Sequence, residues 1–141
     1  MNKPFYITTP IYYVNDAPHI GTAYTTILAD VISRYQKQLG NDSFFLTGLD
    51  EHGQKVQDAA TKRGVHPKDH CDEMSKSFLS LWERLHISNN DFIRTTEDRH
   101  KIVVEKILKT VYNAGDIYED EYEGLYSVSE ERFITEKEAE S

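Results

Sequence analysis

The chain has 141 residues, a formal net charge of −8 at pH 7, 38% hydrophobic residues and a single cysteine. This length allows one domain or part of one, and the acidic balance argues against an extended nucleic-acid-binding surface within it. Cys71 cannot form an internal disulfide, which favours a reducing compartment such as the cytoplasm. No apolar run is long enough to span a membrane, and we expect no signal peptide before the first predicted strand.

The N-terminal segment predicts a strand, a loop and a helix in that order. Residues 5–9 are aromatic and β-branched, which is typical of a strand. Pro10 and Pro18 then bound a segment that we predict to be a loop. From Ile20, apolar residues recur every three or four positions, which predicts a helix that ends near Gly40. This order opens a nucleotide-binding βαβ unit, in which free N–H groups at the helix N-terminus can receive phosphate.

Further strands and helices are predicted to alternate along the chain. Residues 43–48 form a continuous apolar run, which predicts a strand covered on both faces of a parallel sheet. The acidic segment 50–53 opens the next helix, and Gly64 ends it. Pro67 suits the first position of a third helix, and residues 91–94 suit a short strand. The fold class is therefore α/β, with a doubly wound parallel sheet and flanking helices.

The alternation of strands and helices is predicted to end after Gly115. Thr96 is predicted to cap a helix with an inner face of Val103, Ile107 and Val111, and Gly115 ends it. Residues 117–126 alternate weakly, as hairpin or edge strands do. The polar end, residues 135–141, is expected to be frayed.

Four segments resemble the class I aminoacyl-tRNA synthetases in their methionyl-tRNA synthetase form, of bacterial type. Residues 10–15 followed by Pro18-His19-Ile20-Gly21 are similar to the first signature of that family. Residues 45–55, 91–97 and 122–127 then follow in the family's order and extend the resemblance over nearly the whole chain. The resemblance implies that residues 1–115 form the first half of the Rossmann-like catalytic nucleotide-binding domain. It also implies that residues 116–141 begin the connective insertion.

The resemblance assigns three residues to ATP. The reaction joins the methionine carboxylate to the α-phosphate of ATP, so the enzyme must position the reactants and neutralise phosphate charge. His19 and Thr22 would be catalytic and bind ATP, and Gly21 would let the nucleotide approach the backbone. Thr22 departs from the family, which usually has a second histidine there; a hydroxyl can donate a hydrogen bond but cannot become cationic. Without the resemblance, His19 would be read as a capping or packing residue.

Three more residues are assigned to methionine. Ile11 and Tyr13 would line the thioether pocket, where selection rests on apolar shape because a thioether offers almost no hydrogen bonding. Asp50 would hold the α-ammonium group. Its position after the second strand suits a ligand edge, although a plain helix N-cap is the more frequent role for such a residue.

No resident metal is expected. Mg²⁺ would arrive with ATP. His66, His70 and Cys71 offer three zinc ligands without a fourth, so we interpret them as solvated and core residues. Ser127 and residues 130–131 stand where some relatives have the cysteine pairs of a zinc knuckle. Residues 73–77 imitate the mobile lysine loop of the family but are predicted to lie within a helix.

The resemblance therefore implies part of a methionine–tRNA ligase that forms methionyl adenylate and passes it to tRNA. Its partners would be methionine and ATP, with tRNA bound mostly through regions outside this segment, and we expect the chain alone to have little activity. A small α/β nucleotidyltransferase is a second hypothesis, although residues 50–53 have no place in its pattern. A non-catalytic truncated paralogue that binds a partner or tRNA is a third, and the acidic charge disfavours the tRNA version.

Overall fold

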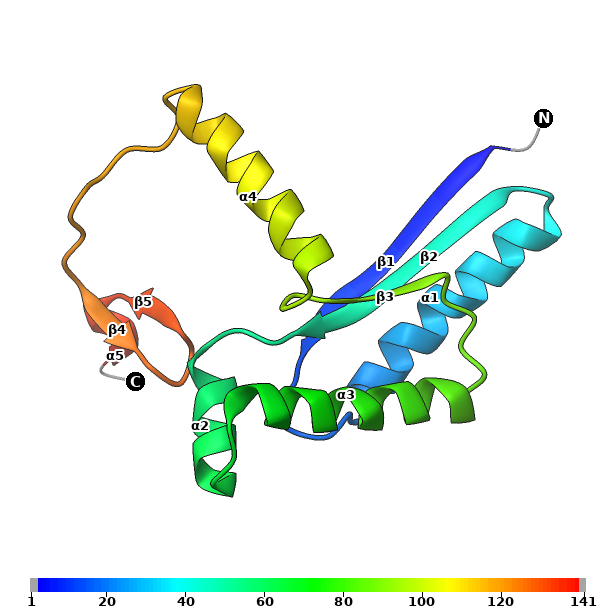
Figure 1. Cartoon of the computed structure of the whole chain (residues 1–141), viewed down its shortest axis with the longest axis horizontal. Coiled ribbons are helices and arrows are strands. Elements are labelled where there is room, and N and C mark those ends of the chain that lie inside the picture. Colours follow the sequence, from blue (N-terminus) through cyan, green and yellow to red (C-terminus); the bar gives the residue numbers. More distant parts are fainter. Residues whose placement is uncertain (1–2, 140–141) are drawn as a thin grey trace. The chain divides into compact units, whose positions relative to one another are not determined.

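The computed structural model describes residues 3–139 and shows an α/β protein (Figure 1). The chain divides into two compact units, Met1–Val104 and Glu105–Ser141. No helix within residues 3–139 is both long and apolar enough to cross a membrane. In chain order the elements are β1 (Pro4–Tyr13), α1 (Ile20–Gln38), β2 (Asp42–Asp50), α2 (Gln54–Arg63), α3 (Pro67–Arg84), β3 (Asp91–Arg94), α4 (Asp98–Asn113), β4 (Leu125–Ser127), β5 (Arg132–Ile134) and α5 (Glu136–Ala139).

The first unit contains a three-stranded parallel sheet in the order β1-β2-β3. The predicted loop after residue 9 is wrong at its start, because β1 continues through Pro10 to Tyr13. The pairing register of β1 with β2 shifts between Thr8 and Ile11. A proline lacks the N–H of a ladder hydrogen bond, and an irregularity on an edge strand is where a sheet tolerates one.

One face of the sheet is covered by helices. Alternate residues of β2 are buried, among them Ser43, Phe45 and Leu49, whereas Phe44 between them is 45% exposed. The Ser43 hydroxyl pairs with that of Ser33 on α1 at 2.9 Å, and Leu49 packs with residues of α3, so both helices lie on this face (Figure 1). The prediction of a strand covered on both faces is therefore wrong for this chain, since Phe44, on the other side of the strand, is nearly half exposed.

Helix α1 packs on the sheet through its polar side. Its buried residues include Thr22, Thr26, Asp30 and Ser33. Burial disfavours a charged Asp30. Hydrogen bonds from the Ser88 hydroxyl and N–H, at 2.6 and 2.7 Å, and from Arg34 outweigh that effect and lower its pKa. The predicted apolar stripe lies on the exposed side; its members from Ile20 to Leu39 include Tyr24, Val31 and Tyr35.

We predict that the isolated chain self-associates or is only marginally stable. The exposed stripe of α1 and the open sheet face, where the rings of Tyr6 and Phe44 lie 6.0 Å apart, present a large apolar surface to water. Light scattering across a concentration series should show a rising average mass. A single monomeric species with a high, concentration-independent melting temperature would contradict this prediction.

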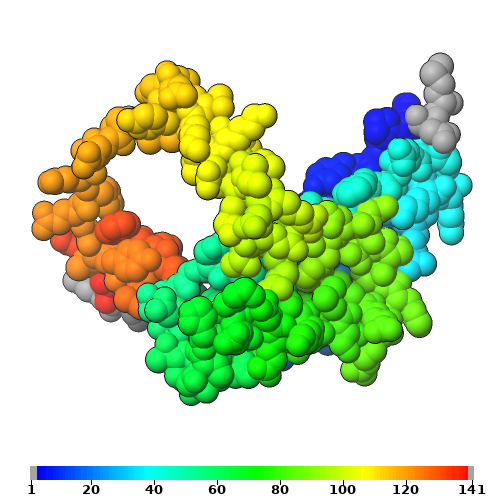
Figure 2. Space-filling view, in the orientation of Figure 1, coloured from blue at the N-terminus to red at the C-terminus, as the bar shows by residue number. Residues whose placement is uncertain are grey.

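The core of the first unit lies between the sheet and α3. Phe78 and Trp82 of α3 are buried with Val14 and Leu49, and the ring of Tyr12 completes an aromatic cluster with centroids 6.0–6.2 Å apart. Figure 2 shows the outer side of α3, in green, as a continuous surface beside α2. This helix begins at Pro67, as the sequence predicts.

Two predicted helix starts are wrong. Helix α2 begins at Gln54 after an N-cap at Gly53 and has no acidic residue in its first turn, so residues 50–52 do not open it. Helix α4 begins at Asp98, and the Thr96 hydroxyl hydrogen-bonds to the carboxylate of Glu51 instead of capping the helix. In both cases a side chain expected at a helix end is used to join the strands.

The second unit holds a short antiparallel hairpin, β4–β5, with Tyr126 opposite Phe133. The Phe133 ring packs edge-on against Tyr122 and Tyr126, with centroids 4.6 and 5.2 Å apart. Only the end of the predicted segment 117–126 is a strand. The predicted frayed end contains the short helix α5, and residues 140–141 lie outside the described range.

The predicted inner face of α4 is exposed. No residue of α4 is buried, and Val103 and Ile107 of the predicted face are more than half exposed. Apolar periodicity shows which side of a helix suits burial but not whether a partner covers it. The prediction of an inner face is therefore wrong for this chain.

Candidate active site

A cavity of about 300 Å³ lies at the carboxyl end of β1. Four of the six predicted site residues, Ile11, Tyr13, His19 and Thr22, line it together. The rest of the lining is Tyr12, Asn15, Asp16, Ala17 and Phe78. The loop between β1 and α1 therefore closes one side of the cavity, and the first turn of α1 forms another. This is the edge of an open parallel sheet at which ligands bind.

His19 is the N-cap of α1, and its capping bond fixes its tautomer. The Gly21 N–H donates to Nδ1 of His19 at 3.1 Å, so Nδ1 is unprotonated in this arrangement. The neutral ring then has its proton on Nε2, where it can donate to a ligand oxygen. Capping and ligand binding are thus compatible roles. A methyl group on Gly21 would lie 3.0 Å from Cε1 of His19, so Gly21 also leaves room for the ring.

Thr22 is buried, 5% exposed, in the first turn of α1. Its carbonyl accepts a hydrogen bond from the Thr26 hydroxyl at 3.0 Å, and Thr26 is in turn 2.9 Å from the hydroxyl of Tyr12. These bonds join the start of α1 to the end of β1. Any side chain at position 22 is therefore presented to the cavity from a fixed backbone.

Ile11, Tyr13 and Asp50 share the uncovered face of the sheet. Ile11 pairs with Gly48 and Tyr13 with Asp50, and directly paired residues of neighbouring strands point to the same face. Asp50 does not line the cavity; it ends the adjacent strand, and its Oδ1 accepts from the His52 N–H at 3.2 Å. It is not a helix N-cap, because that position belongs to Gly53.

A buried ion pair beside Asp50 was not predicted from the sequence. The side chain of Glu51 is fully buried, and its Oε1 lies 2.5 Å from Nε of Arg94 at the end of β3. Burial opposes the charge of Arg94, but its bonds to Glu51 and to Asp72, the latter also 2.5 Å long, raise its pKa. Opposite charges at the carboxyl ends of two consecutive predicted strands are the signal that could have revealed this pair.

The three residues that could suggest a zinc site, His66, His70 and Cys71, have other roles. The ring of His70 is buried, with Nε2 2.7 Å from the Val14 carbonyl and Nδ1 2.9 Å from Nη1 of Arg63. Burial, with a smaller contribution from the nearby charge of Glu51, raises the pKa of Cys71 to about 11, so its thiol stays protonated at neutral pH. His66 caps α3 by accepting from the Lys68 N–H at 3.2 Å. Within residues 3–139 no cluster of His, Cys, Asp and Glu side chains is suited to a metal ion.

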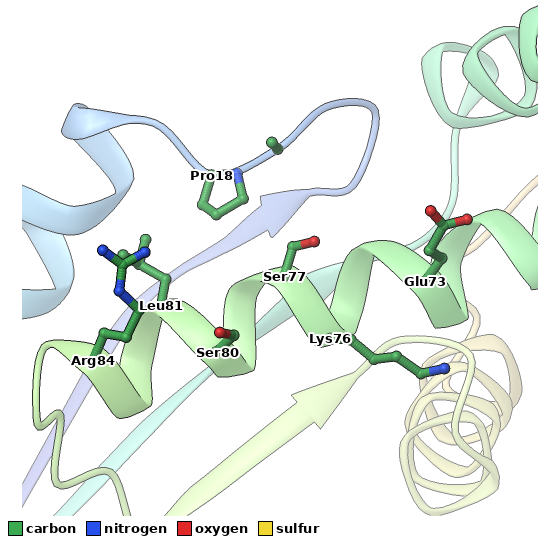
Figure 3. Close-up of a pocket in the computed structure, with 8 residues that line it drawn as sticks. Pro18, Glu73, Lys76, Ser77, Ser80, Leu81 and Arg84 are labelled. Atoms are coloured by element: carbon green, nitrogen blue, oxygen red, sulfur yellow. The ribbon is translucent and has the colours of Figure 1, made fainter.

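A larger groove of about 530 Å³ lies between Pro18 and the side of α3 (Figure 3). Ser77 and Arg84 extend toward the loop of Pro18, whereas Lys76 extends away from it. None of the six predicted site residues lines this groove, whose wall is one helix side and not the ends of strands. The segment 73–77 lies within α3, so its likeness to the lysine loop is superficial, as expected.

Residues 5–141 match the family described as tRNA synthetases class I (M). The chain belongs to this family. It is 57% identical over 136 residues to a methionine–tRNA ligase of Fusobacterium nucleatum and 54% identical to one of Listeria monocytogenes. These alignments cover 96% of this chain but only 21% and 20% of the relatives. The chain thus spans about a fifth of the length of the ligases it matches.

Solved structures agree with the fold. The structure of Mycobacterium tuberculosis methionyl-tRNA synthetase in complex with methionyl-adenylate superposes with a TM-score of 0.91 at 45% identity. The match covers 96% of this chain and 27% of that one. A leucyl-tRNA synthetase from Agrobacterium radiobacter, 23% identical with a TM-score of 0.81, shares the fold. The family resemblance and the α/β prediction of a half Rossmann-like sheet are confirmed.

Proposed function

We propose that this chain is the N-terminal part of a methionine–tRNA ligase, which activates methionine with ATP and transfers it to tRNA. The observation that supports this most directly is the cavity of about 300 Å³, where the first family signature gathers at the end of β1 and the start of α1. The relatives of this chain are methionine–tRNA ligases, and one solved relative holds methionyl-adenylate.

In this proposal two tasks are divided between the residues of the cavity and the adjacent end of β2. Ile11 and Tyr13, on the open face of the sheet, contact the thioether side chain, and the carboxylate of Asp50 binds the ammonium group. His19, with its proton on Nε2, donates to the phosphate oxygens as the methionine carboxylate attacks the α-phosphorus and pyrophosphate leaves. Thr22 adds a hydroxyl donor, and Gly21 leaves space for the nucleotide.

The other partners follow from the same assignment. Mg²⁺ would come with ATP, because Mg²⁺ is usually held by substrate phosphates with one or two carboxylates. The net charge of −8 supports tRNA binding mostly by other parts of the longer protein. We assign residues 1–115 to the first half of the catalytic domain and 116–141 to the start of the connective insertion. A cytoplasmic location fits the buried, reduced Cys71.

A chimera tests this proposal. The chain would replace the matching segment of the Fusobacterium nucleatum ligase, with the rest of that enzyme supplying what the chain lacks. We expect methionine-dependent exchange of pyrophosphate into ATP by the chimera, and little or none by the chain alone. A chimera that folds cooperatively but exchanges no pyrophosphate would overturn the assignment.

The chimera also allows a test of Thr22. Replacing Thr22 with histidine in the chimera should raise the rate of adenylate formation or leave it unchanged, because a cationic donor stabilises charge that develops in the transition state. The gain should be at most that of one charge-assisted hydrogen bond, about 1–3 kcal/mol. Single-turnover adenylate formation with saturating ATP and methionine measures it. A strongly impaired Thr22→His variant would instead show a cavity adapted to the hydroxyl.

A further inference from the structure

A buried carboxylate anchors the C-terminal end of β2 and the residue after it, which together (residues 50–51) are called the exit of β2. Glu51 directly follows Asp50, and its side chain has no exposed surface. A buried charge is costly unless it is paired and hydrogen-bonded. Both conditions are met, because Oε1 accepts from Nε of Arg94 at 2.5 Å and Oε2 accepts from the Thr96 hydroxyl.

Arg94 extends this tie to α3. Its second guanidinium nitrogen, Nη2, lies 2.5 Å from Oδ1 of Asp72, whose other oxygen lies 2.5 Å from the Lys68 ammonium. One guanidinium group therefore joins the exit of β2, the end of β3 and the first turns of α3. Planar, two-branched recognition of this kind fixes geometry in a way that a point charge cannot.

Thr95 holds the same exit by its hydroxyl and its backbone. The Glu51 N–H donates to Oγ1 of Thr95 at 3.0 Å, and the Thr95 N–H donates to the Leu49 carbonyl at 3.2 Å. The Thr95 hydroxyl is also 2.9 Å from Nδ1 of His52. Since Oγ1 accepts from Glu51, its own proton is free to go to His52. The residues on both sides of Asp50 are therefore fastened to the end of β3.

The two carboxylates at this exit differ in how their charges are compensated. Glu51 is neutralised by Arg94, whereas within residues 3–139 no cationic side chain forms an ion pair with Asp50. The negative charge of Asp50 is thus the one left for a ligand. Without its partner, Glu51 would place a second, uncompensated carboxylate beside Asp50.

We propose that Arg94 and Thr95 are positioning residues for methionine: by fixing Glu51 they hold the carboxylate of Asp50 where the substrate ammonium binds. This inference rests on the proposed function of Asp50. It adds a role for the end of β3, whose residues Arg94 and Thr95 do not line the cavity.

The test uses the chimera and compares two kinetic constants. Thr95→Val, which keeps the side-chain shape but removes the hydroxyl, should raise the KM for methionine about tenfold and leave the KM for ATP within twofold. Thr95→Ser should stay close to wild type. The matched control is Thr47→Val: Thr47 is buried in β2 and its hydroxyl lies 2.7 Å from that of Thr9, so this bond joins β2 to β1 and not to the end of β3. This control should lower the melting temperature without changing either KM.

The ion pair between Glu51 and Arg94 is tested separately. Arg94→Gln should raise the KM for methionine by tenfold or more because it leaves Glu51 unpaired. Adding Glu51→Gln should bring the value back to within about threefold of wild type, although both variants lose stability. Unchanged KM for methionine in Thr95→Val and Arg94→Gln, or an equal rise for both substrates, would overturn the positioning role while the proposed function stands. A folded wild-type chimera without exchange activity would overturn both.

Discussion

Replacing His19 with alanine in the chimera is expected to slow methionyl-adenylate formation about 10²–10³-fold, the usual cost of losing one donor to a charged transition state. Methionine affinity should hardly change, because Ile11, Tyr13 and Asp50 lie on the open face of the sheet and not on α1. Single-turnover kinetics with both substrates saturating gives the rate. Equilibrium titration with methionine gives the affinity.

The difficulty with His19→Ala is that it also removes a helix cap, which costs about 0.5–2 kcal/mol of stability. Two variants separate the effects. His19→Asn keeps a good capping side chain without the imidazole, so its melting temperature should recover while its rate stays low. His66→Ala removes the same type of cap from α3, where the ring accepts from the Lys68 N–H, and should leave the rate unchanged. A full-rate His19→Ala enzyme would remove His19 from the catalytic residues.

Local signals in the sequence predict most of the elements correctly. Pro67 predicts the start of α3, and the short segment 91–94 predicts β3. A proline at a first helical position and an apolar pair after an Asn-Asn turn act without distant partners. The family resemblance assigns His19, Thr22 and Ile11 to ligands, and the structure shows that these three residues line one cavity. These predictions depend only on neighbouring residues in the chain or on the order of the family's sequence motifs.

The failures share a different cause. Thr96 and Glu51 both suit a helix N-terminus by residue type, yet they hydrogen-bond to each other across 45 residues of chain. Likewise the apolar stripe of α1, which includes Tyr24 and Val31, suits a core face. The polar side of α1 packs inward instead, because Ser33 bonds to β2 and Asp30 bonds to the loop between α3 and β3. Long-range pairing decides both cases, and periodicity or capping preference contains no information about it.

Gly48 is a further residue whose importance appears only in three dimensions. In the sequence it is one glycine within the apolar run of β2, where it weakens the strand signal. In the sheet it pairs with Ile93, and a Cβ at position 48 would lie 2.1 Å from the carbonyl oxygen of Ile93. That distance is far below any contact that an aliphatic carbon makes, and a backbone oxygen cannot rotate away as a side chain can.

Gly48→Ala is therefore expected to destabilise the fold by about 3 kcal/mol or more, at the upper end of the cost of overpacking. Urea unfolding of the chain, at a concentration low enough to limit self-association, measures the free energy of unfolding.

Gly64→Ala is the matched control. Gly64 caps α2 at φ +67° with nothing within 4 Å of an added Cβ, so the substitution should introduce only backbone strain and lower the stability by about 1 kcal/mol. Because separating β2 from β3 also moves Asp50 away from the Arg94 and Thr95 anchors, Gly48→Ala in the chimera should raise the KM for methionine as well. Equal destabilisation by the two alanines would show that β2 and β3 can separate at little cost.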